Sequence, residues 1–501
     1  RDKSIFDTGI HYIGGLGKGE NLYKFFNYIG IMQDLELKKL DEDGFDFVTF
    51  DDHDVEYCYA QGMDNFVATL SKQFPGEEEA IRTYADKLIE VCDHFPLYNL
   101  RHGNSYDEDL LSISAKEYIE SLTDNTVLQA VLGGTNYLYA GDGYRTPFYV
   151  HALAVKPYIE SSWRCVNGGS QITKLVLRKL REHGGEAYRH QEVTKFNFDG
   201  DDLVSVSTKN GTTVKGDLFI SNIEPKLTIK MLGENRLKKP YVKRVRNIET
   251  IISVFSIHIV FKPKSFKYRN YNYYHCKHPD GMWNAQEYTE ESWPEGYMVS
   301  MSCKKNMGEW AENMTVMTYM NFDEMAPWVD TFNTVADKNP RGENYEEFKA
   351  RKTEGLLKEV EKKFPNIREA MFSIYASTPL SYRDYIGVHR GNMYGSVKDV
   401  ANPMRSFLSP RTRIKNLYLT GQSVNMHGVL GVTISAVLTC STIVGREYLL
   451  NKIIAANEED AVADVEQGEN GVHQSNGSAN DSGSQETVAG NGPSSNKSSA
   501  E

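Results

Sequence analysis

Residues 416–437 read NLYLTGQSVNMHGVLGVTISAV, and this stretch decides the fold. A short apolar run, expected to be a buried strand, ends at Gly421, and a polar loop leads to a second apolar run that is expected to be a helix. Two glycines, Gly428 and Gly431, lie at the expected N-terminus of that helix. A helix N-terminus carries unpaired N–H groups and the positive end of the dipole, and glycines let a flat or anionic ligand approach it closely. The stretch alone allows two interpretations, a ligand cradle or a tightly packed strand–helix turn.

The composition of the whole chain limits its number of domains and its partners. Its 501 residues suffice for two or three domains, and the net charge of −12 argues against nucleic acid as a partner. Six cysteines form no C-x-x-C pair, which is typical of reduced thiols in a cytoplasm. His and Cys also lack the spacing of metal ligands, so we expect no metal site. No apolar run approaches the roughly 20 residues that a membrane-spanning helix needs.

The middle of the chain has an α/β pattern. A helix is expected from Ser170 to Arg181, followed by strands in EAYRHQEVTKFNFD, a hairpin turn at Asn210-Gly211 and a strand that ends at Ser221-Asn222. Residues 20–164 show mostly helical patterns, such as EEEAIRTYADKLIEVCDHF. Residues 236–373 alternate strands (IISVFSIHIVF, TVMTYMNF) with the amphipathic helix NYEEFKARKTEGLLKEVEKKF. The α/β pieces are therefore expected to be interrupted by two insertions.

The C-terminal segment has a different composition. From residue 457 the sequence is rich in Ser, Asn, Gly and acidic residues and almost free of large apolar side chains. Such a segment buries too little surface to offset the entropy of ordering it. We therefore expect residues 457–501 to form a disordered tail.

Four segments resemble the flavoprotein family of carotenoid desaturases (phytoene desaturases), carotenoid isomerases and retinol saturases, which is related to the amine oxidases. They are FDTGIHYIGG at 6–15, NGGSQITKLVLRKLREHGGEAYRHQEVTKF at 167–196, TPLSYRDYIGVHRGNMYG at 378–395, and the opening stretch. The resemblance extends over residues 6–450, and it is close to the bacterial relatives of retinol saturase, the all-trans-retinol 13,14-reductases.

The resemblance implies an α/β flavoprotein with two dinucleotide-binding-type domains built from discontinuous segments. The FAD domain would comprise residues 1–19, 165–235 and 374–450. Residues 20–164 would be a mainly helical substrate or lid insertion, and residues 236–373 a substrate domain with an antiparallel sheet and helices.

The resemblance also assigns cofactor contacts residue by residue. The backbone of Val193 would meet the adenine, and the strand end at Ser221 and Asn222 would lie beside the cofactor. Gly9 and Ile10 would pass along the isoalloxazine ring. The remaining contacts would come from the opening stretch: Gly421 and Gln422 at the ribityl–pyrophosphate, and Leu430, Gly431 and Val432 at the pyrimidine end of the flavin.

One expected motif is missing from the sequence. The family begins with a strand and G-x-G-x-x-G, whose glycines hold the FAD pyrophosphate. GGLGKGENLYKFF at Gly14 has glycines before a helical pattern, but its spacing differs and no apolar strand precedes it. We interpret it as a flexible loop on the substrate side. The sequence therefore looks like a fragment that lacks its N-terminal βαβ start, and we expect weak FAD binding by these 501 residues.

The expected function is that of an FAD-dependent oxidoreductase acting on a C=C bond of an apolar isoprenoid, retinoid or carotenoid, with NAD(P)H as a candidate electron donor. Desaturation or cis–trans isomerisation of a carotenoid is the alternative on the same scaffold, and an inactive fragment or binding protein is the alternative of another class. Aromatic clusters at residues 135–149 and 268–276 suit an apolar substrate. His11 and His427 could shuttle a proton, but the pattern assigns no catalytic residue. The expected location is the cytoplasm, with peripheral contact to a membrane as a way to collect the substrate.

Overall fold

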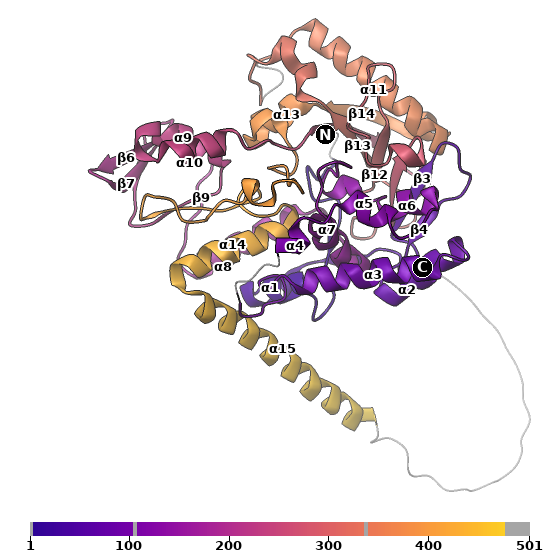
Figure 1. Ribbon diagram of the computed structural model, residues 1–501, viewed down its shortest axis with the longest axis horizontal. Coiled ribbons are helices and arrows are strands. Elements are labelled where there is room, and N and C mark those ends of the chain that lie inside the picture. Colours follow the sequence, from indigo (N-terminus) through magenta and orange to yellow (C-terminus); the bar gives the residue numbers. More distant parts are fainter. Residues whose placement is uncertain (1–3, 104–107, 335–338, 476–501) are drawn as a thin grey trace, which may run out of the picture.

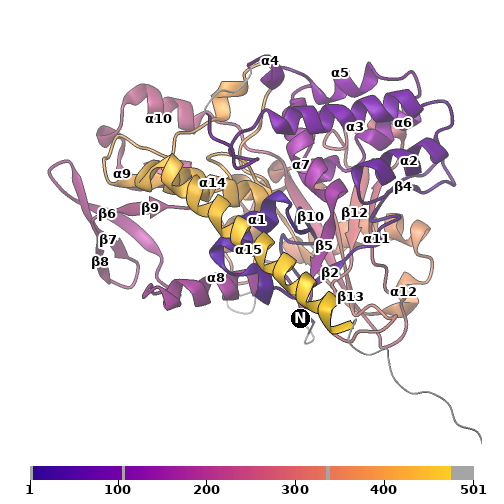
Figure 2. The ribbon, with the colours of Figure 1, turned by 90° about the horizontal axis from the view of Figure 1, so that it is seen from below.

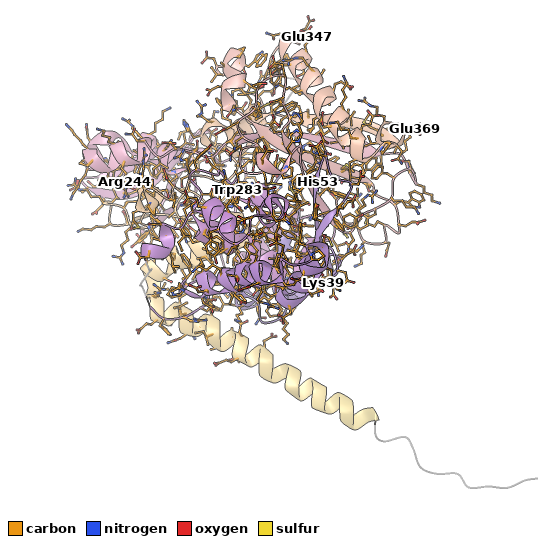
Figure 3. All side chains as sticks on the ribbon, turned by 45° about the vertical axis from the view of Figure 1, so that its right-hand side comes forward. Lys39, His53, Arg244, Trp283, Glu347 and Glu369 are labelled. Carbon is orange, nitrogen blue, oxygen red and sulfur yellow. The ribbon has the colours of Figure 1, made fainter. Side chains whose placement is uncertain are left out.

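The computed structural model describes residues 4–103, 108–334 and 339–475. A large body contains two sheets and most of the helices, and a smaller lobe lies to one side of it (Figures 1 and 2). The helix α15 (Arg446–Ser475) projects from the body (Figure 1). Trp283 lies within the packed interior of the body, while Glu347 and Glu369 mark its surface and Arg244 marks the smaller lobe (Figure 3). None of the helices in the described ranges is both long enough and apolar enough to cross a membrane.

A seven-stranded sheet forms the centre of the body. Its strand order is β14-β10-β13-β12-β11-β3-β4, antiparallel except for the parallel pair β3 and β11. The strands are β3 (Asp46–Phe50), β4 (Tyr57–Tyr59), β10 (Ser253–Phe261), β11 (Asn272–Cys276), β12 (Gly296–Ser300), β13 (Asn313–Met320) and β14 (Met371–Ser377).

Two hydrophobic cores cover the two faces of this sheet, because side chains alternate along each strand. In β10, Phe255, Ile257 and Ile259 face a core shared with α11 (Glu343–Lys363). On the opposite face, Val254 joins a larger core formed largely with helices from residues 63–160. These helices are α2 (Met63–Gln73), α3 (Glu78–Asp93), α4 (Glu108–Leu111), α5 (Ala115–Glu120), α6 (Thr126–Leu132) and α7 (Phe148–Glu160).

A second, three-stranded sheet has the order β1-β5-β2 and consists of β1 (Ile13–Gly14), β5 (Ser162–Cys165) and β2 (Leu37–Lys39). The helix α1 (Asn21–Ile29) follows β1. The segment 20–164, expected to be mainly helical, thus also supplies β2 to β5. The strand DFVTF at β3 is too short and too weakly alternating to be distinguished from loop by periodicity.

The smaller lobe joins segments that are far apart in sequence. Its strands are β6 (Val193–Asp199), β7 (Asp202–Thr208) and β8 (Thr213–Lys215) in one sheet, and the parallel pair β9 (Phe219–Ser221) and β15 (Leu417–Leu419). The nearby helices are α8 (Ser170–Glu182), α9 (Pro225–Leu232), α10 (Lys239–Arg246) and α14 (Gly428–Val444), while α12 (Ile367–Ala370) and α13 (Pro379–Ile386) belong to the body (Figures 1 and 2). The predicted helix at 170–181, the hairpin at Asn210-Gly211 and the strand–loop–helix of the opening stretch are confirmed.

The C-terminal segment differs from its prediction. The helix α15 (Arg446–Ser475) continues through residues 457–475, which were expected to be disordered. Asn457 donates from Nδ2 to the Lys24 carbonyl at 3.1 Å, and Tyr23 donates its hydroxyl proton to Asp460 at 3.0 Å. The Glu- and Ala-rich sequence NEEDAVADVE favours a helix once its start is docked on α1. Residues 476–501 lie outside the described part of the chain.

A buried polar network ties the N-terminal segment to both sheets. Asp46 on β3 accepts hydrogen bonds from Asn272 Nδ2 at 2.8 Å and from the Tyr12 hydroxyl at 2.7 Å. Arg164 on β5 donates to Asn272 Oδ1 at 2.6 Å, and the Tyr12 and Tyr274 hydroxyls lie 2.5 Å apart. Burial raises the pKa of Asp46 to about 7, against the opposing effect of these hydrogen bonds.

We predict that Arg164→Met destabilises the fold. Arg164 is 1% exposed and donates to four acceptors in residues 268–272, so the substitution leaves buried oxygens without donors. The expected loss in free energy of unfolding is about 3 kcal/mol or more. Urea denaturation followed by tryptophan fluorescence measures it. Arg181→Met, at an exposed position of α8, is the matched control, and an equal loss in both variants would contradict the network's role.

Candidate functional site

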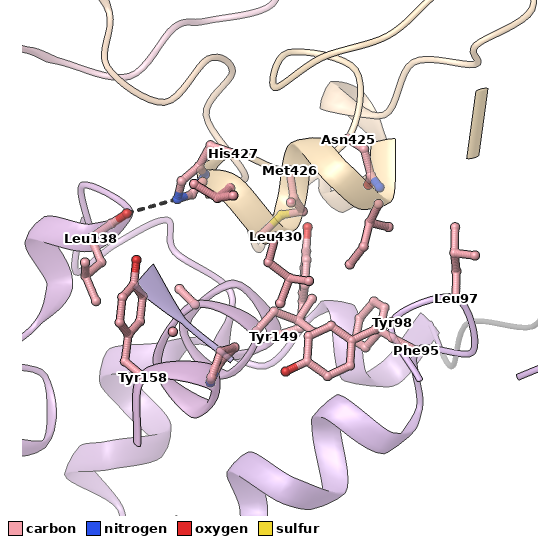
Figure 4. A pocket seen from close by; sticks show the side chains of 18 of the residues that line it. Phe95, Leu97, Tyr98, Leu138, Tyr149, Tyr158, Asn425, Met426, His427 and Leu430 are labelled. Carbon is pink, nitrogen blue, oxygen red and sulfur yellow. Dashed lines mark hydrogen bonds between the residues drawn. The ribbon is translucent and has the colours of Figure 1, made fainter. Parts of the chain in front are cut away.

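An aromatic pocket with a cavity volume of about 100 Å³ lies under the N-terminus of α14 (Figure 4). One wall comes from Phe95 and Tyr98, another from Tyr149 and Tyr158 on α7, and the α14 side contributes residues 425–431. Ile13 and Gly14 also line it. The pocket thus brings the segment after FDTGIH together with the HGVLG turn, although more than 400 residues separate them in the chain.

The N-terminus of α14 carries no side-chain cap from its own N-cap residue, His427. The His427 ring instead donates from Nε2 to the Leu138 carbonyl at 3.0 Å (Figure 4), since a carbonyl oxygen only accepts. Gly428 has φ +72°, and a Cβ built on it would meet no atom within 4 Å. The first-turn amides of α14 therefore begin beside an open space, which suits a ligand that accepts hydrogen bonds.

Gly9 and Ile10 lie close to this helix. Ile10 packs against the same small core as Val429 and Leu430. Gly9 is exposed, and a Cβ built on it would meet no atom within 4 Å. The structure therefore brings the predicted contacts Gly9, Ile10 and Leu430 into one region, with room left beside Gly9.

A second group of predicted residues meets where β9 and β15 end side by side. Ser221 closes β9, and its carbonyl accepts from the Thr420 amide at 3.0 Å. Gly421 has φ +102°, and a Cβ there would collide with Asn222 Oδ1. The Gly421 amide donates to Ser435 Oγ on α14 at 3.1 Å. Gln422 follows and is half-buried.

Two other predicted contacts, Val193 and Val432, lie less close to these two groups of residues. Val193 begins β6 in the separate three-stranded sheet and is 37% exposed. Val432, on α14, is also 37% exposed, and the buried side of that helix carries Gly431, Ser435 and Thr439.

Gly431 has a packing role in this structure. A Cβ on Gly431 would lie 2.8 Å from the backbone carbon of Met426 and 2.9 Å from its Cβ. Both are closer than side chains tolerate. The glycine is therefore needed to close the turn before α14, and this need exists without any ligand.

Both histidines singled out in the sequence are neutral at physiological pH. Burial lowers the pKa of His427 to about 4, with a further contribution from the positive charge of Lys398. Burial, and then the charge of Arg164, lowers the pKa of His11 to about 4. Within the described ranges, no group of three or more His, Cys, Asp or Glu side chains is placed to hold a metal ion.

A polar pocket of about 240 Å³ adjoins the same turn, and sequence reasoning missed it. His427 lines both pockets. Lys398 also lines the polar pocket, only three residues after the motif TPLSYRDYIGVHRGNMYG, but nothing in SVKDVANP signals a functional side chain. Of the two aromatic clusters, the one at 135–149 contributes to the pockets, whereas β11 in the 268–276 cluster is buried within the sheet.

The glycine-rich segment at Gly14 is not a phosphate-binding loop. β1 pairs antiparallel with β5, and a Cβ on Gly14 would lie 2.6 Å from the backbone of Pro157 on α7. The Gly17 amide donates to Glu20 Oε2 at 2.7 Å and to Ser161 Oγ at 3.0 Å. The segment is thus a packed and hydrogen-bonded turn rather than the flexible loop that the sequence suggested.

The chain is similar in sequence to known flavoproteins. The family model described as flavin containing amine oxidoreductase matches residues 1–326. The chain is 27% identical over 492 residues to an all-trans-retinol 13,14-reductase from Rattus norvegicus, and 25% identical over 484 residues to one from Danio rerio. Each match covers 88% of this chain and 78% of the relative.

The fold is also found among solved structures. A putrescine oxidase variant superimposes with a TM-score of 0.53 at 12% sequence identity, over 87% of this chain and 85% of that one. The family match covers well over half of the sequence, and the flavoprotein fold expected from the resemblance is confirmed. The chain therefore belongs to the flavin-containing amine oxidoreductase family and is an FAD-dependent oxidoreductase.

Proposed function

We propose that this protein reduces a C=C bond in an apolar, isoprenoid-like polyene, as the name of its all-trans-retinol 13,14-reductase relatives suggests. The aromatic pocket under α14 carries the proposal. Its walls are mostly aliphatic and aromatic side chains, which suit a long apolar body that offers few hydrogen-bonding groups.

The residues around α14 fit the flavin. Gly9 and Gly428 leave open space where a ring could approach the backbone, and the α14 N-terminus offers uncapped amides and a positive dipole. We assign the flavin ring to this region, with Ser221, Asn222, Gly421 and Gln422 toward the ribityl–pyrophosphate and Val193 toward the adenine. When bound and reduced, FAD supplies the hydride for alkene reduction, with NAD(P)H as the proposed source of electrons.

Reduction of a C=C bond adds a hydride to one carbon and a proton to the other. His427 is a poor source of that proton, because its Nε2 hydrogen is held by Leu138 and its other nitrogen lacks a proton at a pKa of about 4. Tyr158 lines the pocket opposite α14 (Figure 4), and its hydroxyl can donate a hydrogen bond to a bound substrate. We propose Tyr158 as the proton donor.

The reaction is tested by the mass of the product. Protein reconstituted with FAD and supplied with dithionite under anaerobic conditions should convert all-trans-retinol, or a related polyene, to a product heavier by two hydrogen atoms. Loss of two hydrogen atoms under oxidising conditions would indicate desaturation, and an unchanged mass with altered retention would indicate isomerisation. Recovery of unchanged polyene from flavin-loaded protein would refute all three activities for that substrate.

The flavin assignment is tested by paired glycine substitutions. Gly9→Val should lower FAD affinity about tenfold or more, since its side chain would enter the open space, while the melting temperature of the apoprotein stays unchanged. Gly431→Val should cost about 1–3 kcal/mol of stability with or without FAD, because it overpacks against Met426. Flavin absorbance and thermal melts measure both effects. Wild-type FAD affinity in Gly9→Val would show that the ring lies elsewhere.

Tyr158→Phe tests the proton donor. The change keeps the ring and the pocket wall, so polyene binding and flavin content should be retained, while turnover falls about 100-fold or more. Single-turnover oxidation of the reduced flavin by the polyene gives the rate. Tyr98→Phe, on another wall of the same pocket, is the matched control. Equal rates in Tyr158→Phe and wild type would exclude this role.

A further inference from the structure

The aromatic and polar pockets share a lining residue, His427, on the turn before α14. The His427 ring lies beside that of Tyr394, tilted by 37° with the ring centroids 4.6 Å apart. Phe407 lines the aromatic pocket, and its ring centroid lies 5.2 Å from Nζ of Lys398, which lines the polar pocket. The ammonium group of Lys398 therefore lies between the polar pocket and a wall residue of the aromatic pocket.

Lys398 is 8% exposed, and its Nζ has no hydrogen-bond partner among the described residues. Ser396 Oγ, two residues earlier and on the wall of the same pocket, also lacks one. The other cations of the polar pocket are satisfied. Arg145 pairs with Glu249 at 2.7 Å and with Asp399 at 3.4 Å, and Arg390 pairs with Asp323 at 2.8 Å.

A buried ammonium without a counter-charge is costly, and proteins pair such groups or leave them for a ligand. Burial lowers the pKa of Lys398 only to about 8, so the side chain remains mostly charged at neutral pH. Lys398 and Ser396 can both donate hydrogen bonds. A group that complements the two of them is therefore an anion with at least two acceptor atoms, and a carboxylate has this chemistry.

We propose that Lys398, assisted by Ser396, binds the carboxylate of an apolar polyenoic acid whose hydrocarbon body occupies the aromatic pocket. This inference rests on the proposed function and specifies its substrate class: an acid is preferred over the corresponding neutral ester. Lys398 acts here as a binding and positioning residue. It fixes one end of an extended molecule, so that a particular C=C bond stays beside the α14 N-terminus.

The test uses parinaric acid, a fluorescent polyenoic acid, and its neutral methyl ester, titrated into the full chain. Wild type should bind the acid about tenfold or more tightly than the ester. Lys398→Met should bind acid and ester equally, with the ester affinity and FAD content of wild type. Lys398→Arg should restore the preference, because it keeps the charge. Lys415→Met, at an exposed position before β15, is the control and should behave as wild type.

The outcomes separate this inference from the function on which it rests. Two results would overturn the role of Lys398: equal affinities of wild type for the acid and the ester, or a preference for the acid that survives in Lys398→Met. In either case binding of the ester would still support the proposed reductase function. Failure of both acid and ester to bind would overturn the apolar-substrate assignment, and this inference with it. If Lys398→Met does not fold, Lys398→Gln gives the same comparison with a neutral polar side chain.

Discussion

The carboxylate of Asp46 lies where the N-terminal segment, the seven-stranded sheet and the three-stranded sheet of the body meet, and it holds them together. It is fully buried and receives the Tyr12 hydroxyl from the N-terminal segment and the Asn272 amide from β11. Arg164 then links Asn272 to the small sheet that contains β1. Since β1 directly follows the segment assigned to the flavin, this network fixes the position of one side of the site. Buried polar groups of this kind are costly when half-satisfied, so the network specifies one arrangement of the sheets over others.

The opposite side of the site is the helix α14, whose position depends on small residues. α14 is held against the smaller lobe by contacts between small polar groups: Ser435 Oγ with the Gly421 backbone, and Thr439 Oγ1 with the Leu419 carbonyl at 3.0 Å. Large side chains on that face would push the helix away from β15. The apolar residues Val432 and Ala436 instead lie on an exposed side of the helix. The site is thus a space between a side anchored by a polar network and a helix seated on small residues.

Much of this architecture could be predicted from the sequence, where local patterns are strong. The helix at 170–181, the Asn-Gly hairpin and the strand–loop–helix at 416–437 carry caps, turns and periodicity that act over a few residues. The reason for Gly431 could not be derived, because the sequence does not reveal that Met426 folds back onto it. Lys398 and Tyr158 were missed for a similar cause: their importance comes from what surrounds them in space. The helix through residues 457–475 was missed because composition does not register docking on α1.

The pairing of β9 with β15 has a consequence for how the protein is made. Leu417 pairs with Phe219, roughly 200 residues earlier in the chain, so the loop closed by this contact is very long. Contacts of such high sequence separation form late and slowly. On the ribosome, the seven-stranded sheet can be complete once β14 has emerged, whereas the smaller lobe must wait for residues beyond 419. Synthesis of this chain therefore yields a folded body around the seven-stranded sheet before it yields the smaller lobe, and the exposed β9 edge needs protection during that interval.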